Sequence, residues 1–266
     1  MNIFRRAAVI VHRCGLELLL ALAIVALVGQ LAWPAARDWW RLPAPGTVGI
    51  DRVDSHGALA AEYLVYLPDE GEAPWPLVVF LHGSGERGND PNVLRDWGPF
   101  RYLKRTSLPA IVAAPQCLPT RRWEAAAVMQ FVDRLSERYQ VDRERIYLVG
   151  CSMGGYGTWR TAAAYPAQFA AIAPICGGGQ PEDAEALADM PIWAFHGAKD
   201  DVVPISESER MVEAVRAAGG APKLTVFPDA GHGICHPVCE RTNLWNWLLR
   251  QKASGGRTSI ANETSP

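Results

Sequence analysis

Short apolar runs alternate with amphipathic segments along most of the chain. Short apolar runs that are rich in β-branched types and bounded by turn residues are typical of buried strands, whereas apolar residues three and four apart are typical of helices. On these patterns the sequence predicts strands at residues 59–68, 76–83, 109–116, 145–150, 169–178, 190–197 and 222–232, and helices at residues 123–139, 154–165, 206–220 and 241–251.

This alternation predicts one α/β domain built on a mostly parallel sheet. Strands that are joined by helices form right-handed βαβ units, so successive strands run parallel and helices flank the sheet. Ligands bind such a sheet at the carboxyl ends of its strands. We therefore expect the chemistry of this chain in the loops that follow the strands.

The first 40 residues follow a different pattern. Residues 18–36 include no charged residue, and about 20 apolar residues are enough for a helix to cross a bilayer. Basic residues precede this run, and tryptophans near its end suit a membrane interface. The run is longer than the apolar core of a cleaved signal peptide and lacks a clean A-x-A site. The pattern favours an uncleaved transmembrane signal anchor over a signal peptide, and either would place the remaining chain outside the cytoplasm, anchored or secreted.

The remaining chain has the composition of one globular domain. Hydrophobic types make up 49% of the sequence and the formal net charge is −2, so no basic field indicates a nucleic-acid partner. We predict a signal anchor or signal peptide at residues 1–40, a linker at 41–58, a catalytic domain at 59–252 and a disordered tail at 253–266. Residues 180–189 are too few for a large cap, and the insertion at 86–108 could roof the site instead.

The cysteines near the carboxyl terminus permit two interpretations. An exported chain can form disulfides, and Cys235 and Cys239 lie in a stretch that is typical of a Pro-containing loop, so we predict this pair as a disulfide. The same stretch offers His232 and His236 at a spacing that zinc sites use. Because no second cluster accompanies these residues, we predict no metal and no cofactor.

Residues 150–154 form the pattern G-x-S-x-G between a predicted strand and a predicted helix. This is the context of a nucleophile elbow, a sharp turn whose small flanking residues permit close backbone approach. Ser152 stands at the centre of the turn and is expected to project into the site. Cys151 is intrinsically the stronger nucleophile, but it is still leaving the strand. We predict that Cys151 is a packing residue and that Ser152 reacts.

A serine hydroxyl needs a base to accept its proton and an acid to orient that base. In a sheet of this kind the order along the chain is serine, acid, histidine. His232 fits the base, with His236 as a close competitor, whereas His196 comes before the acid. The acid is Asp200 or Asp201, between which spacing cannot choose. Asp229 is interpreted as a turn residue.

An oxyanion hole needs backbone N–H groups that point at the developing negative charge. One N–H should come from Met153, which follows the nucleophile. The other should come from the loop after residues 76–83, where Ser84 is the first choice and Gly85 the second. His82 precedes the serine and is expected to brace this loop.

Taken together, these segments resemble a known family. "FLHGSGERGND", "APQC" followed by Trp123, "GCSMGGYGTW", "PICGGG", "HGAKDDVVP" and "DAGH" are similar to motifs of compact α/β-hydrolase esterases, the phospholipase/carboxylesterase and dienelactone-hydrolase-like group. The resemblance covers residues 63–251 and implies the α/β-hydrolase fold. It also implies that Asp200 is the acid, that His232 is the base, and that Ser84 and Met153 form the oxyanion hole.

The central elbow residue defines the expected chemistry. Dienelactone hydrolases have cysteine there, whereas this chain has Ser152, which implies a serine esterase that forms an acyl-enzyme. The charged insertion at 86–108 indicates a small-molecule ester with a small or polar acyl group. The alternatives are a serine peptidase of the same fold and a non-catalytic binding protein on a hydrolase scaffold.

Overall fold

The computed structural model describes residues 42–53 and 57–253. Within these residues, none of the helices has both the length and the apolar character needed to cross a membrane. The anchor or signal peptide predicted for residues 1–40 lies outside the described residues. So does the predicted tail, apart from Ala253.

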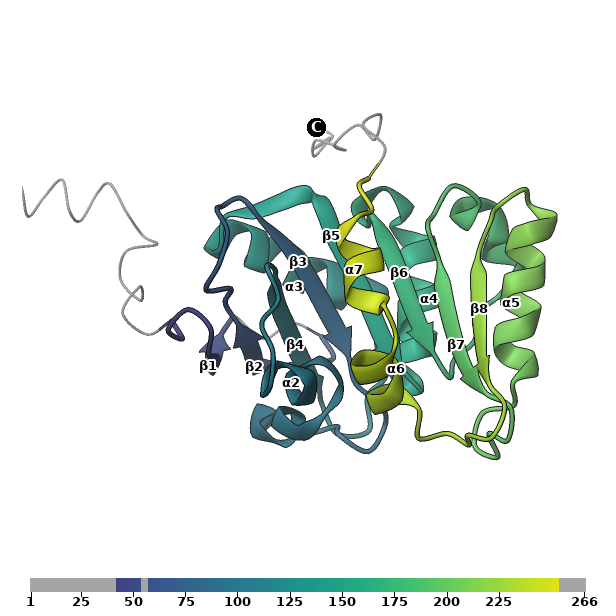
Figure 1. The fold of residues 1–266 in the computed structure, drawn as a ribbon, viewed down its shortest axis with the longest axis horizontal. Coiled ribbons are helices and arrows are strands. Elements are labelled where there is room, and N and C mark those ends of the chain that lie inside the picture. The colour runs from purple at the N-terminus through teal and green to yellow at the C-terminus, as the bar shows by residue number, and fades with distance from the viewer. Residues whose placement is uncertain (1–41, 54–56, 254–266) are drawn as a thin grey trace, which may run out of the picture. The chain divides into compact units, whose positions relative to one another are not determined.

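Eight strands form one sheet in the order β1-β2-β4-β3-β5-β6-β7-β8 (Figure 1). The strands β3 to β8 pair in parallel, whereas β2 runs antiparallel to both β1 and β4. The mostly parallel sheet expected from the sequence is therefore present. The strand bounds are β1 Val48–Arg52, β2 Leu59–Tyr66, β3 Trp75–Leu81, β4 Ile111–Cys117, β5 Val141–Cys151, β6 Ala171–Ile175, β7 Trp193–Gly197 and β8 Lys223–Phe227.

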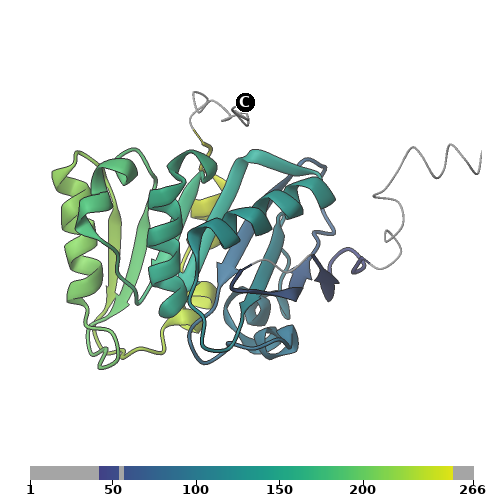
Figure 2. The ribbon, with the colours of Figure 1, turned by 180° about the vertical axis from the view of Figure 1, so that it is seen from behind.

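Helices cover both faces of the sheet, because the central strands are apolar on both sides. Every residue of β4 and β6 is buried, which is typical of parallel sheets between helical layers. The α-helices are α2 Gly98–Leu103, α3 Ala125–Arg138, α4 Met153–Ala164, α5 Ser206–Ala217, α6 Cys235–Arg241 and α7 Leu244–Leu249. In Figure 1, α2, α6 and α7 lie in front of the sheet, and Figure 2 shows α3, α4 and α5 on the opposite face.

The β6–β7 and β3–β4 connections contain only short helical segments. Between β6 and β7 the described chain forms only the 3-10 helix η4 Pro181–Leu187, so no cap domain stands there. The insertion at residues 86–108 forms the 3-10 helix η2 Pro91–Asp96 and α2. A further 3-10 turn, η3 Pro166–Gln168, follows α4.

The strand β1 corrects part of the predicted linker at residues 41–58. Asp51 on β1 is buried and accepts hydrogen bonds from Tyr63, from Tyr139 and from both Arg138 Nε and Arg138 Nη2. These donors come from β2 and from the end of α3, far along the chain. A strand of five residues whose second residue is Gly49 has little local signal. Long-range hydrogen bonds of this kind cannot be predicted from the local pattern.

Helix α6 corrects the prediction for the last cysteines. Residues 235–239 are helical rather than a loop, and Cys235, Val238 and Cys239 are buried on one face. Pro237 is tolerated because it lies in the first turn, where a backbone N–H has no helical partner. The five cysteines of the described residues are free thiols, so the predicted Cys235–Cys239 disulfide is wrong. Their spacing reflects helical packing against the core.

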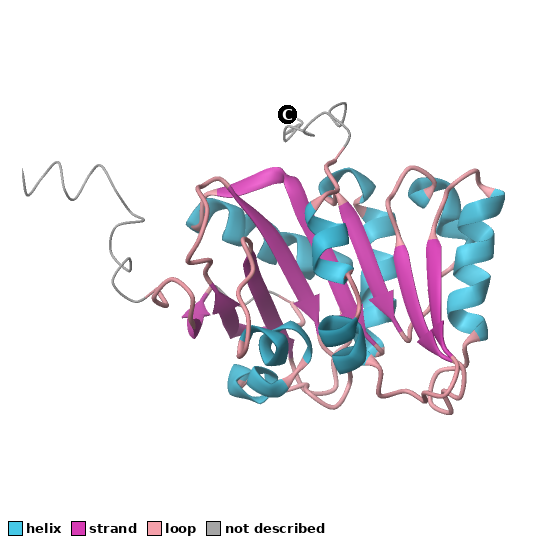
Figure 3. Ribbon diagram, viewed as in Figure 1, coloured by secondary structure: helices cyan, strands magenta, loops and turns pink. Residues whose placement is uncertain are grey.

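The carboxyl ends of the parallel strands converge at one edge of the sheet (Figure 3). The loops after β3, β5 and β7 start there, and the segment after β8 leads to α6. The predicted site residues belong to these four connections.

Candidate active site

Ser152 lies on the sharp turn between β5 and α4, and its backbone is held in a sparsely populated conformation with φ of 56°. The turn is tight enough to exclude side chains at the flanking glycines. A Cβ atom on Gly150 would lie 2.2 Å from the carbonyl oxygen of Gly154, and one on Gly154 would lie 1.9 Å from that of Leu81. The glycines of G-x-S-x-G are therefore sterically required, as in a nucleophile elbow.

A continuous hydrogen-bond chain links three of the predicted residues. The Ser152 Oγ lies 2.8 Å from His232 Nε2. The other ring nitrogen of His232, Nδ1, lies 2.7 Å from Asp200 Oδ2. Because the carboxylate can only accept, Nδ1 carries a proton, and Nε2 is free to accept the proton of Ser152 when the imidazole is neutral. The geometry of this arrangement is that of a serine activated by an oriented base.

The carboxylate of Asp200 is held by the loop after β7. Burial by itself would raise its pKa, but hydrogen bonds from the Val203 N–H, from His232 and from the Val202 N–H outweigh burial and lower the pKa below its usual value. Asp201 is exposed, so the structure distinguishes the two neighbouring acids that spacing could not. Asp229 is exposed and pairs with Lys199 at 2.9 Å, as expected for a turn residue.

The other histidines of this region do not contact Ser152 Oγ. His82 Nε2 accepts from the Cys117 N–H at 3.0 Å, so Nδ1 donates to the Gly83 carbonyl at 2.6 Å and braces the loop after β3. His196 is fully buried beside Asp200, with Nε2 3.3 Å from Oδ2. His236, the competitor for the base, packs against the Trp97 ring.

Ser84, from the loop after β3, and Met153, from the start of α4, line one cavity. Met153 is the first residue of α4, where a backbone N–H has no partner within the helix. Ser84 also lines the cavity that contains Ser152. Trp123 Nε1 donates to the His82 carbonyl at 3.0 Å and fixes the loop that presents Ser84.

Cys151 is buried at the end of β5, where its thiol hydrogen-bonds with that of Cys235. This hydrogen bond, followed by burial, raises the pKa of Cys151 well above its usual value. A thiol with a raised pKa carries little of the reactive thiolate. Cys151 is therefore a packing residue, as predicted. It lies against α6 and is a poor competitor for Ser152.

Two side chains of the Ser152 cavity were missed by the sequence analysis. The cavity has a volume of about 210 Å³. Trp97, from the insertion at 86–108, and Glu86 contribute to its lining. Burial raises the pKa of Glu86, although backbone hydrogen bonds from Gly83 and Glu86 oppose the effect. Neither residue belongs to a motif with a fixed spacing, so no sequence signal pointed to them.

The zinc interpretation of residues 232–239 is not supported by the geometry. His232 is engaged with Ser152 and Asp200, while Cys235 and Cys239 face the core. In the described part of the chain, the metal-ligand atoms that converge belong to Cys176, His196 and Asp200. Both ring nitrogens of His196 already have partners in Ser208 and Val203, and Asp200 is held by His232.

The sheet order, the elbow at Ser152 and the hydrogen-bonded histidine define a protein of the α/β-hydrolase class. Residues 108–243, about half of the chain, match the sequence model of the dienelactone hydrolase family. The chain belongs to the dienelactone hydrolase family.

Similar proteins agree with this class. A bifunctional acetylxylan esterase/xylanase of Neocallimastix patriciarum is 27% identical over 158 residues, which cover 57% of this chain and 23% of that protein. The crystal structure of a thermostable esterase is 31% identical with a TM-score of 0.63, covering 77% of this chain and 63% of that one. A ferulic acid esterase structure has a TM-score of 0.56 at 16% identity, and the match covers 77% of this chain and 98% of that one. At this identity the likeness supports only the fold. The chain thus spans less than two thirds of the first two proteins.

Proposed function

We propose that this chain is a serine hydrolase that cleaves carboxylic esters of small or polar acyl groups. The observation that carries the proposal is the hydrogen-bond chain Ser152–His232–Asp200, with separations of 2.8 and 2.7 Å. Its position at the carboxyl ends of a parallel sheet, within a family of hydrolases, supports the same conclusion.

In the proposed reaction, Ser152 Oγ attacks the ester carbonyl while His232 Nε2 accepts its proton. Asp200 orients the imidazolium and stabilises its charge. The N–H groups of Met153 and Ser84 stabilise the oxyanion. His232 then protonates the leaving alcohol, which gives an acyl-enzyme on Ser152. Water, deprotonated by His232, attacks this acyl-enzyme and releases the carboxylic acid.

The size of the cavity supports small substrates. Its volume of about 210 Å³ is below the range of roughly 300–1,000 Å³ that is typical of sites for drug-sized ligands. Trp97 and His236 form one wall, and their rings lie 5.1 Å apart between centroids. A large ester would have to extend beyond this cavity.

A panel of 4-nitrophenyl esters, from acetate to palmitate, tests this proposal beside matched 4-nitroanilides. We expect kcat/KM to peak at short acyl chains. Ser152→Ala should lower kcat by a factor of about 10⁴ or more, as removal of a triad serine does elsewhere, while the fold is retained. A peak at long chains would contradict the acyl preference. Faster cleavage of the anilides would indicate a peptidase, and no turnover of any substrate would favour a binding protein.

We also propose that residues 1–40 anchor the chain in a membrane with the hydrolase domain outside the cytoplasm. The proposal is supported by the uncharged run at residues 18–36 and the basic residues before it. Separation of membranes from the soluble fraction, followed by protease treatment of intact cells, tests it. A full-length chain found in the cytoplasmic soluble fraction would refute it.

A further inference from the structure

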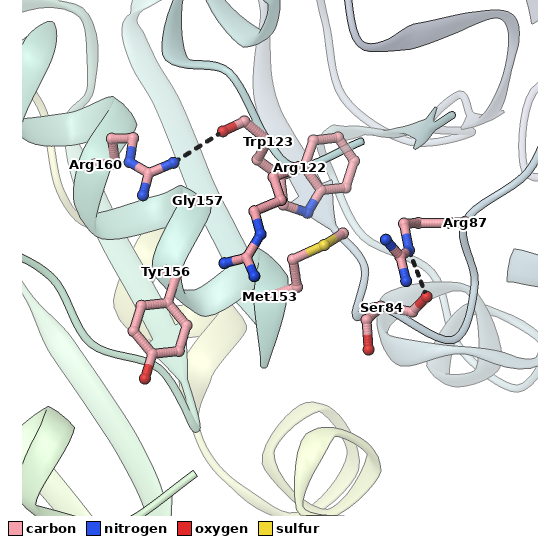
Figure 4. Close-up of a pocket in the computed structure, with 8 residues that line it drawn as sticks. All are labelled: Ser84, Arg87, Arg122, Trp123, Met153, Tyr156, Gly157 and Arg160. Atoms are coloured by element: carbon pink, nitrogen blue, oxygen red, sulfur yellow. Dashed lines mark hydrogen bonds between the residues drawn. The ribbon is translucent and has the colours of Figure 1, made fainter. Parts of the chain in front are cut away.

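A second cavity, of about 260 Å³, lies beside the start of helix α4, where Met153, Tyr156, Gly157 and Arg160 contribute to its lining (Figure 4). Ser84 and Met153, the proposed oxyanion donors, form part of its wall. Neither Ser152 nor His232 lines it. The cavity therefore adjoins the reacting carbonyl group of a bound ester but not the proton-transfer pair.

Three arginines contribute to the wall of this cavity: Arg87, Arg122 and Arg160. They come from three separate segments, the loop after β3, the loop after β4 and helix α4. Arginine guanidinium groups are well suited to carboxylate recognition because they present paired N–H donors. Three such groups in the wall of one cavity beside Ser152 therefore make this cavity suited to binding a carboxylate.

The three guanidinium groups have no carboxylate partner among the described residues. Arg87 Nε donates to the Ser84 carbonyl at 2.9 Å, and Arg160 donates to the Trp123 carbonyl at 3.4 Å. No hydrogen bond or ion pair in the described part of the chain engages Arg122. Nearby carboxylates are already paired, Glu124 with Arg121 at 2.8 Å and Glu207 with Arg210 at 3.1 Å. The cavity thus holds positive charge that the protein itself does not neutralise.

The position of His232 decides which end of the ester reaches this cavity. The leaving oxygen must lie near His232 Nε2, because that nitrogen returns the proton to it. The alcohol side of the ester therefore occupies the cavity that His232 lines. The acyl substituent diverges from the leaving oxygen at the tetrahedral carbon. It is the acyl side that is directed past the oxyanion donors toward the arginines.

We propose that the arginine cavity is a subsite for an anionic group on the acyl side, so that the preferred substrates are half-esters of dicarboxylic acids. This inference rests on the proposed esterase function. Ser152 Oγ would form the new acyl bond and the alcohol would leave with the proton from His232. The acyl-enzyme keeps its distal carboxylate near Arg122 and Arg160. Water then releases the free dicarboxylate and regenerates Ser152.

The test measures kcat/KM of the full-length chain on mono-4-nitrophenyl glutarate, adipate and suberate, each beside its methyl-masked neutral diester. We expect the best anionic ester to exceed its masked counterpart by at least about tenfold, the effect of one charge-assisted hydrogen bond. The ratio should fall in 0.5 M NaCl, because salt screens exposed charges. Equal rates for all three pairs would overturn the proposal.

Variants locate the effect. Arg122→Gln and Arg160→Gln should each lower the ratio of anionic to masked ester by about threefold or more, and together they should bring it near one. Arg250→Gln is the matched control, because this exposed arginine follows α7 and does not line the cavity. If the double variant still prefers the anionic ester to its masked counterpart as strongly as the wild type does, the assignment to this cavity is wrong.

A second pair places the charge on the alcohol, 4-acetoxybenzoate beside its methyl ester. We expect no preference for this anion, and a preference here without one on the acyl side would refute the proposed orientation. Turnover of the masked diesters distinguishes failure of the anionic subsite from failure of the proposed esterase function. If they are cleaved without any charge preference, only the subsite fails. If no ester is cleaved, the esterase function fails and the subsite fails with it.

Discussion

The two halves of the candidate site are held in place by different physics. The nucleophile half, around Ser152, is defined by backbone sterics: a positive φ and glycines that admit no Cβ. The base half, Asp200 and His232, is held by side-chain hydrogen bonds between loops 32 residues apart in the chain. Steric requirements are local and leave a motif in the sequence. Residues that meet through hydrogen bonds between distant loops leave no such local motif, and the structure shows which of them meet.

Asp200→Asn tests the base half and should give the largest effect. The amide removes the negative charge and can leave His232 in the wrong tautomer, so we expect kcat to fall by a factor of about 10⁴ with little loss of fold. Asp201→Asn is the matched control, because its exposed carboxylate should matter by less than about twofold. Steady-state kinetics on a short-chain ester measures both. Equal losses would mean that the acid has been assigned wrongly.

Gly154→Ala tests the nucleophile half through stability. Its new methyl group would meet the backbone of Leu81 at 1.9 Å, so we expect a loss of at least about 3 kcal/mol in the free energy of unfolding, or failure to fold. Gly233→Ala, in the base half, is the control. A Cβ there meets nothing within 4 Å, and the free energy should change by less than about 0.5 kcal/mol. If the two variants lose the same free energy of unfolding, backbone sterics do not distinguish the nucleophile half from the base half.

The pH dependence of stability probes His82, which braces the nucleophile half. Burial, the largest cause, lowers its pKa from 6.5 to about 4 in the folded chain. The unfolded chain therefore binds a proton between these pH values and the folded chain does not, so the folded state loses stability as pH falls through this window. The loss should approach about 3 kcal/mol by pH 4.

Urea unfolding of the wild type and of His82→Gln at several pH values measures this loss. In His82→Gln, the free energy of unfolding should not show the loss that protonation of His82 causes between pH 6.5 and pH 4. NMR titration of the His82 ring in the wild type provides a second measurement, which does not depend on how well the variant folds. A ring that becomes protonated near pH 6.5 would contradict the assignment.

The smallest effect is expected at Cys151, where the two halves touch through Cys235. Cys151→Ala should cost about 1 kcal/mol of stability, as removal of a small buried group does, and should leave kcat within about threefold. Because the described cysteines are free thiols, a reductant should leave the wild-type unfolding midpoint unchanged. If the unfolding midpoint falls on reduction, the wild-type chain contains a disulfide and the assignment of free thiols is wrong.

The elbow and the parallel sheet were predictable because their signals are local. Ser152, His232 and Asp200 were found from strand order and motif, and the choice between Asp200 and Asp201 needed either the family resemblance or the structure. Helix α6 was missed because its cysteines and Pro237 read as a loop, although Cys235, Val238 and Cys239 follow helical spacing. Strand β1 was missed because the partners of Asp51 lie on β2 and at the end of α3. Contacts of that range have no signature in a single sequence.

The central claim is that Ser152 is the activated nucleophile. Labelling of the full-length chain with a fluorophosphonate, followed by peptide mass spectrometry, tests it most directly. We predict one adduct, on the peptide that contains Ser152, formed quickly in the wild type, slowly in Asp200→Asn and not at all in Ser152→Ala. No adduct on the folded wild-type chain, or an adduct on another residue that persists in Ser152→Ala, would contradict the account.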